Sequence, residues 1–267
     1  MIKVIVAGTA GRMGSRLVAL MKESAALTLG AAVEKKCHVA VGGDAGELAG
    51  CGPSLVLIED DLSACIGKGE VIIDFSSPAA TLEHMRVAAA GHKAMVIGTT
   101  GFSTTEMDEL KQLSKQIACV FSPNMSVGVN LLFKVLTEMA RTLHEDYDIE
   151  VIEAHHRLKK DAPSGTALKM AEVLAKAMGK DLGEIANYSR KGIIGERKEG
   201  EIGIQTIRAG DIVGDHTVIF GGMGERIEVT HRAQSRDTFV RGALRAARWV
   251  VRRPPGLYDM LDVLGLR

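Results

Sequence analysis

The 267-residue chain has no excess of charge of either sign, because its 33 lysines and arginines equal its 33 aspartates and glutamates. This balance is not typical of general nucleic-acid binders, which use cations to replace the counterions of the phosphate backbone. No apolar run reaches the roughly 20 residues that a membrane-spanning helix needs. The apolar stretch at the N-terminus is too short for a signal peptide. We therefore expect no nucleic-acid partner, no membrane association and a cytoplasmic location.

Cysteine and aromatic residues are also scarce. The four cysteines have no CxxC spacing among them: Cys37, Cys51, Cys65 and Cys119. Isolated thiols of this kind are typical of a reduced cytosolic protein and not of a disulfide framework or metal site, so we expect no bound metal. Aromatic residues make up only 4% of the chain, whereas glycine is abundant with 30 residues. This composition indicates many tight turns.

The N-terminal half alternates between short apolar runs and segments with helical spacing. Strands are predicted over residues 2–7, 27–33, 55–58, 71–75, 94–97 and 118–121. Helices are predicted between them, over 12–23, 78–90 and 104–116. Strands that alternate with helices are typical of a doubly wound parallel sheet.

The pattern changes in the second half. Long helices are predicted over 127–143, 163–178 and 237–251, and a strand over 149–154. Residues 201–231 alternate in polarity and contain glycine-rich turns, which predicts antiparallel strands of an open sheet. The glycine- and charge-rich segment 180–200 is expected to be a mobile surface loop.

A glycine-rich loop, Gly8-Thr9-Ala10-Gly11-Arg12-Met13-Gly14, connects the first predicted strand to the first predicted helix. Glycines at such a turn let the backbone approach a pyrophosphate, and the helix N-terminus offers it free N–H groups. Glu34 ends the second strand, where a ribose-binding carboxylate is expected. Because the spacing is GxxGxxG and not GxGxxG, a glycine-rich turn in an unrelated α/β protein, with Glu34 simply solvated, remains an alternative.

Two further segments follow strands of the same predicted sheet. Gly98-Thr99-Thr100-Gly101 follows the strand at 94–97, and Ser122-Pro123-Asn124-Met125 follows the strand at 118–121. Ligands of open α/β sheets bind outside the carboxyl ends of the strands, so both segments are candidates to contact a nicotinamide ring. Taken alone, each could equally be an ordinary turn.

The segment from Glu153 to Leu168 contains the densest group of reactive side chains. Two histidines, an arginine and two lysines fall within it, just before a helix N-terminus that carries Ser164 and Thr166. Cations, free N–H groups and a proton donor are what a small dicarboxylate substrate requires. A basic run of this composition is also common on a solvated surface. The adjoining Pro-Ser-Gly-Thr sequence favours a site.

These motifs together closely resemble the 4-hydroxy-tetrahydrodipicolinate reductase (dihydrodipicolinate reductase) family along the whole chain. The segment at 153–168 is similar to the family's E-x-H-H-x-x-K-x-D-x-P-S-G-T-A signature. The other similar segments are the loop at 8–14, Asp74-Phe75-Ser76, the GTTG at 98–101, residues 124–130, residues 208–216 and residues 230–233. The resemblance implies a Rossmann-type doubly wound parallel sheet with an inserted α+β domain that has an open mixed sheet.

The resemblance also implies that the chain has two domains with different roles. Residues 1–126 with 236–267 would bind NADH or NADPH, and residues 127–235 would bind substrate and form a homotetramer. The implied cofactor contacts are Gly8, Thr9, Ala10, Gly11, Arg12 and Met13 for the pyrophosphate, Glu34 for the adenosine ribose, and Gly98, Thr99, Thr100, Ser122, Pro123, Asn124 and Met125 for the nicotinamide. Lys35, beside Glu34, and the following Lys36 could pair with a 2′-phosphate, so we expect both cofactors to be used.

For catalysis, the resemblance implies that His155 donates or accepts a proton and that Lys159 is a second proton donor. His156, Gly165 and Thr166 would hold the substrate carboxylates. Two positions leave questions open. Leu158 stands where many family members have a polar residue, and Lys160 follows Lys159 closely enough for their roles to be exchanged.

The implied reaction is the NAD(P)H-dependent reduction of 4-hydroxy-tetrahydrodipicolinate to tetrahydrodipicolinate, with loss of water, on the diaminopimelate route to lysine. Two alternatives stay open at this point. One is another Rossmann dehydrogenase that acts on an amino acid or sugar, and the other is a nicotinamide-sensing module without turnover. The first would not require the segment at 153–168, and the second would be expected to carry a DNA-binding or effector region, which the sequence does not show.

Overall fold

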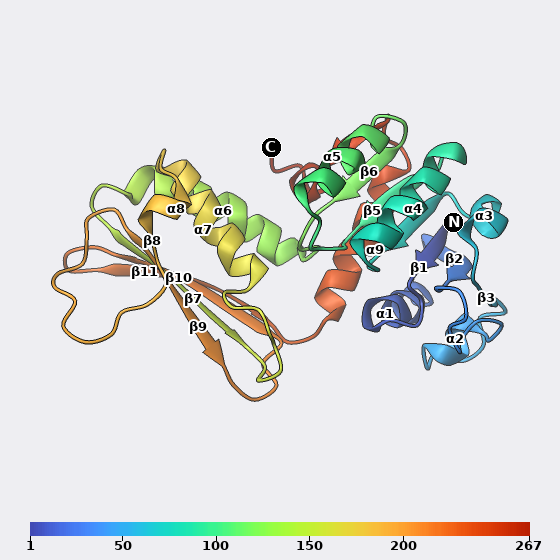
Figure 1. Cartoon of the computed structure of the whole chain (residues 1–267), viewed down its shortest axis with the longest axis horizontal. Helices are drawn as coiled ribbons and strands as arrows, with labels where there is room; N and C mark the ends of the chain where they lie inside the picture. Colours follow the sequence, from blue (N-terminus) through green and yellow to red (C-terminus); the bar gives the residue numbers. More distant parts are fainter. The chain divides into compact units, whose positions relative to one another are not determined.

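The computed structural model describes every residue from Met1 to Arg267 (Figure 1). The chain divides into two compact units. The first comprises Met1–Val127 and Asp237–Arg267, and the second comprises Gly128–Arg236. None of the helices combines the length and the apolarity that crossing a membrane requires.

The first unit is built on a seven-stranded sheet in which every neighbouring pair is parallel. Its strand order is β12-β6-β5-β4-β1-β2-β3. The strands are β1 (Ile2–Ala7), β2 (Leu27–Val33), β3 (Ile58–Glu59), β4 (Val71–Asp74), β5 (Ala94–Ile97), β6 (Ala118–Phe121) and β12 (Gly256–Tyr258). The order reverses between β1 and β4, and crevices at such a point bind ligands in doubly wound sheets.

Helices cover both faces of this sheet (Figure 1). They are α1 (Arg12–Met21), α2 (Ala45–Leu48), α3 (Leu62–Cys65), α4 (Pro78–Ala90), α5 (Thr104–Leu113), α9 (Asp237–Val250) and α10 (Met260–Leu264), with a 3-10 turn η1 at Ile66–Lys68. Alternate residues of β1 point to opposite faces, as strand geometry requires. Val4 and Val6 pack in one core with α1 and α9, whereas Ile5 and Ala7 pack in another with α4 and α5.

The second unit contains a five-stranded mixed sheet with the order β11-β10-β7-β9-β8. Its strands are β7 (Asp148–His155), β8 (Ala186–Asn187), β9 (Ile202–Arg208), β10 (Gly214–Gly221) and β11 (Arg226–Ala233). The helices α6 (Val127–Leu143) and α7 (Gly165–Ala177) supply most of the helical side of its core, and the short α8 (Leu182–Ile185) adds to it. Every second residue of β10 is buried, so one face of the sheet packs on these helices.

The structure corrects several sequence-based expectations. Within 201–231, β10 and β11 pair antiparallel as expected, but β9 pairs with β7, to which it is parallel because α7 crosses over between them. The segment 180–200 is not simply a mobile loop: it contains α8 and β8, and its Arg190 and Arg197 form ion pairs with Glu150. The strand predicted at 55–58 is reduced to β3, and β12 and α10 were not predicted.

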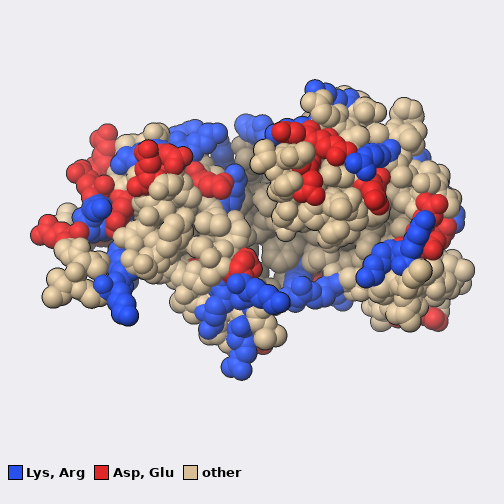
Figure 2. Space-filling view, in the orientation of Figure 1, with Lys and Arg blue, Asp and Glu red and all other residues tan.

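The surface matches the balanced composition. On the face drawn in Figure 2, acidic and basic side chains lie interspersed among neutral residues and are not separated by sign. This arrangement gives no reason to expect a broad single-sign field over that face.

Candidate active site

The glycine-rich loop lies at the carboxyl end of β1 and leads directly into α1. Gly8 has φ +70°, a left-handed conformation that favours glycine. Gly14 is required for a different reason, because a Cβ there would lie 2.1 Å from the carbonyl oxygen of Gly8. The side chain of Thr9 is buried, and its hydroxyl donates to the carbonyl of Val6 at 2.9 Å. The loop is thereby held close to the end of the sheet.

The start of α1 carries no side-chain cap. Gly11 is the N-cap residue, and it has no side chain to accept from the first-turn N–H groups. Those groups therefore stay available to an external acceptor, and the positive end of the helix dipole adds to the attraction for an anion. The loop and the helix start thus fit the pyrophosphate of a dinucleotide.

Glu34 follows β2 and reaches back to the glycine loop. One of its carboxylate oxygens accepts from the N–H of Ala10 at 3.0 Å, and the other accepts from the N–H of Lys35 at 3.0 Å. A cavity of about 480 Å³ opens beside them, lined among others by Glu34, Lys35, Lys36, Ser76 and His84. A space of this size with a carboxylate on its wall fits an adenosine group.

Asp74 and His84 form a pair at this edge that sequence reasoning did not identify. The carboxylate of Asp74 is fully buried at the end of β4 and lies 2.7 Å from Nδ1 of His84. It also accepts from the N–H of Ser76 at 2.7 Å, and Ser76 packs against Gly8. The pair therefore fixes the turn that faces the glycine loop. Asp74 belongs to the Asp74-Phe75-Ser76 segment that the family resemblance singled out, but nothing in the sequence points to His84.

The two turns predicted to contact a nicotinamide follow β5 and β6, which are neighbours in the sheet. A Cβ on Gly98 would lie 2.0 Å from the ring of Phe75, so only glycine fits there. The Thr99 hydroxyl lies 2.8 Å from that of Thr81, and the Ser122 hydroxyl donates to the Asn124 carbonyl at 2.7 Å. All the predicted cofactor residues therefore meet at the carboxyl edge of one sheet: Gly8, Thr9, Ala10, Gly11, Arg12, Met13, Glu34, Lys35, Gly98, Thr99, Thr100, Ser122, Pro123, Asn124 and Met125.

In the second unit, a buried carboxylate organises the histidine-rich segment. Along β7, the alternation of buried residues places Val151, Glu153 and His155 on the face that packs against the helices. The Glu153 side chain has no exposed surface. A carboxylate in such a position needs partners for its charge.

Glu153 has five such contacts. Arg208, on the neighbouring β9, donates to both carboxylate oxygens at 2.8 Å. Nδ1 of His155 lies 2.6 Å away, and the N–H of Ser164 and the hydroxyl of Thr206 donate at 3.0 and 3.2 Å. Burial opposes ionisation, but the bonds from His155, Arg208 and Ser164 outweigh it and lower the pKa of Glu153 to about 2. The carboxylate is therefore charged throughout the neutral range.

The other ring nitrogen of His155, Nε2, faces Gly214. A Cβ on Gly214 would lie 3.0 Å from Nε2, so the missing side chain leaves room at this atom. The ring also packs edge-on against His216, with 5.2 Å between ring centroids. With Nδ1 committed to Glu153, Nε2 is the atom of His155 that can give or take a proton from a ligand.

His216 is a buried neutral base beside this pair. Burial lowers its pKa to about 3, and the nearby His155 adds to the effect. The Ser164 hydroxyl accepts from the N–H of Ala167 as the cap of α7, and it lies 2.9 Å from Nε2 of His216. Nδ1 of His216 is buried with no partner.

The structure distinguishes the two adjacent lysines. Lys159 is partly buried and pairs with Asp161 at 2.8 Å, and this bond lowers the pKa of the Asp161 carboxyl. The Asp161 carbonyl accepts from Arg208, which links Lys159 to the Glu153 network. Lys160 is exposed and forms no ion pair, and Leu158 is 78% exposed.

The three predicted substrate contacts lie on either side of this network. His156 directly follows β7, and Gly165 and Thr166 form the first turn of α7 after the Ser164 cap. Gly165 is exposed, whereas His156 and Thr166 are partly exposed. No group of three or more His, Cys, Asp or Glu side chains is arranged to hold a metal ion.

Comparisons with known proteins agree with this geometry. Residues 2–125 match the family model described as dihydrodipicolinate reductase, N-terminus, and residues 128–264 match the model for its C-terminus. The chain is 57% identical over its full length to a 4-hydroxy-tetrahydrodipicolinate reductase of Syntrophus aciditrophicus (strain SB), and 54% identical to one of Geobacter metallireducens, also over the full length of both chains.

Solved structures show the same likeness. A dipicolinate-bound dihydrodipicolinate reductase from Paenisporosarcina sp. TG-14 superposes with a TM-score of 0.78 at 25% identity, covering 98% of each chain. An amine dehydrogenase from Mycobacterium smegmatis, at 14% identity and a TM-score of 0.61, covers 97% of this chain and 95% of its own. The second likeness concerns the fold alone.

Proposed function

The chain belongs to the dihydrodipicolinate reductase family, and from this premise we propose that its chemistry depends on the buried Glu153 carboxylate and the groups that it holds. The protein is an oxidoreductase of the diaminopimelate route to lysine. It reduces 4-hydroxy-tetrahydrodipicolinate to tetrahydrodipicolinate with loss of water, and it uses NADH or NADPH. Another dehydrogenase activity, or a sensor without turnover, is not favoured by full-length relatives that all carry the same name.

The first unit is the proposed dinucleotide-binding domain. Residues 8–13 would hold the pyrophosphate, and Glu34 would accept from the adenosine ribose, with Lys35 beside it. The turns at 98–100 and 122–125 would frame the nicotinamide. When bound, the cofactor supplies the hydride. The fit of these residues is supported by the uncapped start of α1 and by the 480 Å³ cavity beside Glu34.

The second unit is the proposed substrate-binding domain. Its ligand is a small dicarboxylate, a class supported by the dipicolinate in the related solved structure. His156 and the first-turn groups at Gly165 and Thr166 would hold the carboxylates, because a helix start attracts anions. Pinning both carboxylates orients the ring for reduction.

The observation that carries the proposal is the contact between His155 and Glu153. An ionised, fully buried carboxylate 2.6 Å from Nδ1 fixes the ring orientation. Nε2, over Gly214, is then the atom that delivers a proton to the substrate. Lys159, held by Asp161, would be the second donor. Both groups offset negative charge that develops as the imine is reduced.

The test is steady-state kinetics with freshly made substrate, followed by NADH absorbance. His155→Gln and Lys159→Ala should each lower kcat by about 10²–10⁴-fold with a smaller change in the KM for NADH. Lys160→Ala is the matched control, because Lys160 is an exposed neighbour without an ion pair, and it should keep nearly full activity. Near-wild-type turnover in both of the first two variants would overturn the assignment.

We also propose a homotetramer that acts in the cytoplasm. The strand β11 pairs only with β10 and exposes most of its side chains, and open edges of this kind favour association. The cytoplasmic location is supported by the biosynthetic family and by four unpaired cysteines. Light scattering should give about four times the 28.5 kDa chain mass, and a monomer at micromolar concentration would reject the assembly.

A further inference from the structure

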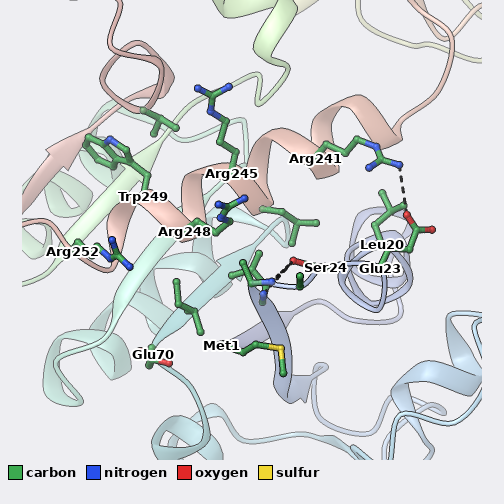
Figure 3. Close-up of a pocket in the computed structure, with 16 residues that line it drawn as sticks. Met1, Leu20, Glu23, Ser24, Glu70, Arg241, Arg245, Arg248, Trp249 and Arg252 are labelled. Carbon is green, nitrogen blue, oxygen red and sulfur yellow. Dashed lines mark hydrogen bonds and ion pairs between the residues drawn. The ribbon is translucent and has the colours of Figure 1, made fainter.

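The first unit contains a second and larger cavity, of about 1090 Å³, at the amino edge of its sheet (Figure 3). Its walls include Ile2 and Leu27, which begin β1 and β2, and Glu70, which precedes β4. The glycine loop lies at the other end of β1, about 20 Å away for a strand of six residues. The cavity is therefore separate from the proposed dinucleotide site.

Four arginines line this cavity: Arg241, Arg245, Arg248 and Arg252. They follow one another at helical spacing along α9 and just past its end, so they share one face. In Figure 3, the side chain of Arg241 reaches Glu23, that of Arg252 extends toward the space between α9 and Met1, and that of Arg245 extends from α9 away from Met1. The chain has no acidic residue between Thr238 and Tyr258.

These arginines lack the partners that other arginines of the chain have. Arg16 pairs with Asp237 at 2.6 Å, and Arg190 pairs with Glu150 at 2.7 Å. By contrast, Arg245, Arg248 and Arg252 form no ion pair, and Arg241 has only the exposed contact with Glu23 at 3.8 Å. Like charges at this spacing destabilise a helix. The negative end of the α9 dipole attracts cations and can account for the presence of Arg248 and Arg252. It does not account for Arg241 and Arg245, which lie too far from that end of the helix.

The spacing of the arginines indicates the kind of anion. Arg241 and Arg248 are separated by about 10 Å along the helix axis, so a single phosphate cannot contact the whole row. Guanidinium groups bind phosphate oxygens in bidentate fashion, and successive arginines suit successive phosphoryl groups. The cavity also has an apolar wall that includes Leu20, Leu244 and Trp249. We propose that this cavity binds an oligophosphate chain, either free or as the phosphate chain of a nucleotide.

The only tryptophan of the chain, Trp249, lines the cavity and reports on it directly. The experiment titrates the full-length protein, saturated with NAD⁺ to occupy the dinucleotide site, at about 0.15 M salt. The probes are sodium tripolyphosphate, GTP and inorganic monophosphate. Tripolyphosphate should change the tryptophan emission saturably and bind at least about tenfold more tightly than monophosphate. Calorimetry on the same samples detects binding that leaves the emission unchanged.

Arg245→Gln combined with Arg248→Gln should weaken tripolyphosphate binding by at least about tenfold and make it less dependent on salt. The matched control removes two cations from the same unit but away from the cavity, by Arg86→Gln with Lys111→Gln, and should bind as the wild type does. Both double variants should keep the reductase activity, which shows that they are folded.

The two sources of the phosphate chain give different results. Binding of GTP that is tighter than binding of tripolyphosphate identifies a nucleotide, and equal binding identifies the chain alone; either supports the site. The proposal is overturned if neither probe binds by emission or calorimetry, or if the Arg245→Gln, Arg248→Gln variant binds as tightly as the wild type.

Discussion

Replacing Arg208 by methionine should destabilise the second unit by about 3–5 kcal/mol, the usual cost of removing one partner of a buried ion pair. Arg208 provides two bonds of 2.8 Å to a carboxylate with no exposed surface. Without it, Glu153 keeps only His155, Ser164 and Thr206 as partners, and methionine fills part of the volume without replacing the charge. The same change also removes the bond of 2.6 Å that ties Arg208 to the Asp161 carbonyl.

A double variant tests whether the buried charge is the cause. Glu153→Gln with Arg208→Met removes both charges and leaves an amide oxygen for the Ser164 N–H. It should be at least about 1 kcal/mol more stable than Arg208→Met alone, because no uncompensated carboxylate remains. If the double variant is as unstable as the sum of the single changes, charge burial is not what makes Arg208 necessary.

The assay is amide hydrogen exchange of residues 148–155, which form β7 and carry Glu153. Tryptophan emission would be unsuitable because Trp249 lies in the first unit. The matched control is Arg226→Met, which breaks a pair whose side chains are 71% and 45% exposed and should cost under about 1 kcal/mol. An effect of Arg208→Met no larger than that of the control would refute the reasoning.

The pH dependence gives an independent check of the same network. The pKa of Glu153 is lowered from its ordinary 4.5 to about 2, so the folded state favours the charged form. The resulting stability is present above pH 4.5 and is lost as the pH falls toward 2. The difference corresponds to about 3 kcal/mol. Arg208→Met should reduce this acid-dependent loss, because the carboxylate then has fewer groups that favour its ionisation.

Three further predictions concern other parts of the chain. Since Glu34 repels a 2′-phosphate and Lys35 and Lys36 attract it, the preference between NADH and NADPH should stay under about 30-fold. Replacing both lysines by alanine should lower kcat/KM for NADPH relative to NADH, and an unchanged ratio would exclude them from recognition. The pKa of His216 is lowered from 6.5 to about 3, so the folded state loses stability as the pH falls below 6.5. His216→Asn should make stability depend less on pH below 6.5, and an acid unfolding curve parallel to that of the wild type would contradict this. Gly14→Ala should raise the KM for NADH by at least about tenfold, because its Cβ would displace the loop, and a wild-type KM would show that the loop adapts.

Local signals made much of the first unit predictable. Its strands are short and apolar, each is followed by a helix or turn, and Gly8 through Gly14 sit where a parallel sheet binds a dinucleotide. The short β12 could not be found in this way. Its three residues, Gly256 to Tyr258, form a strand only because β6 is there to pair with them. Propensity over so few residues carries little information.

The sequence identified the segment that contains the candidate substrate site, but not the residues from other strands that contact this segment. His155 and Lys159 lie within a few residues of each other, so a single segment of the sequence identified both. Arg208 is 55 residues away from Glu153 and reaches it through the pairing of β9 with β7. The expectation of antiparallel strands over 201–231 did not give this pairing, because it did not identify β7 as the neighbour of β9.

The register of the sheet therefore determines whether Glu153, His155 and Arg208 can contact one another. β7 is the strand between β9 and β10, and its Glu153 lies opposite Thr206 on one side and His216 on the other. Two residues farther along, His155 lies opposite Arg208. A slip of one residue would turn Glu153 to the other face of the sheet and leave Arg208 without its carboxylate. Because a misregistered sheet would separate Glu153 from Arg208, the same ion pair that orients His155 also stabilises the one register in which the site exists.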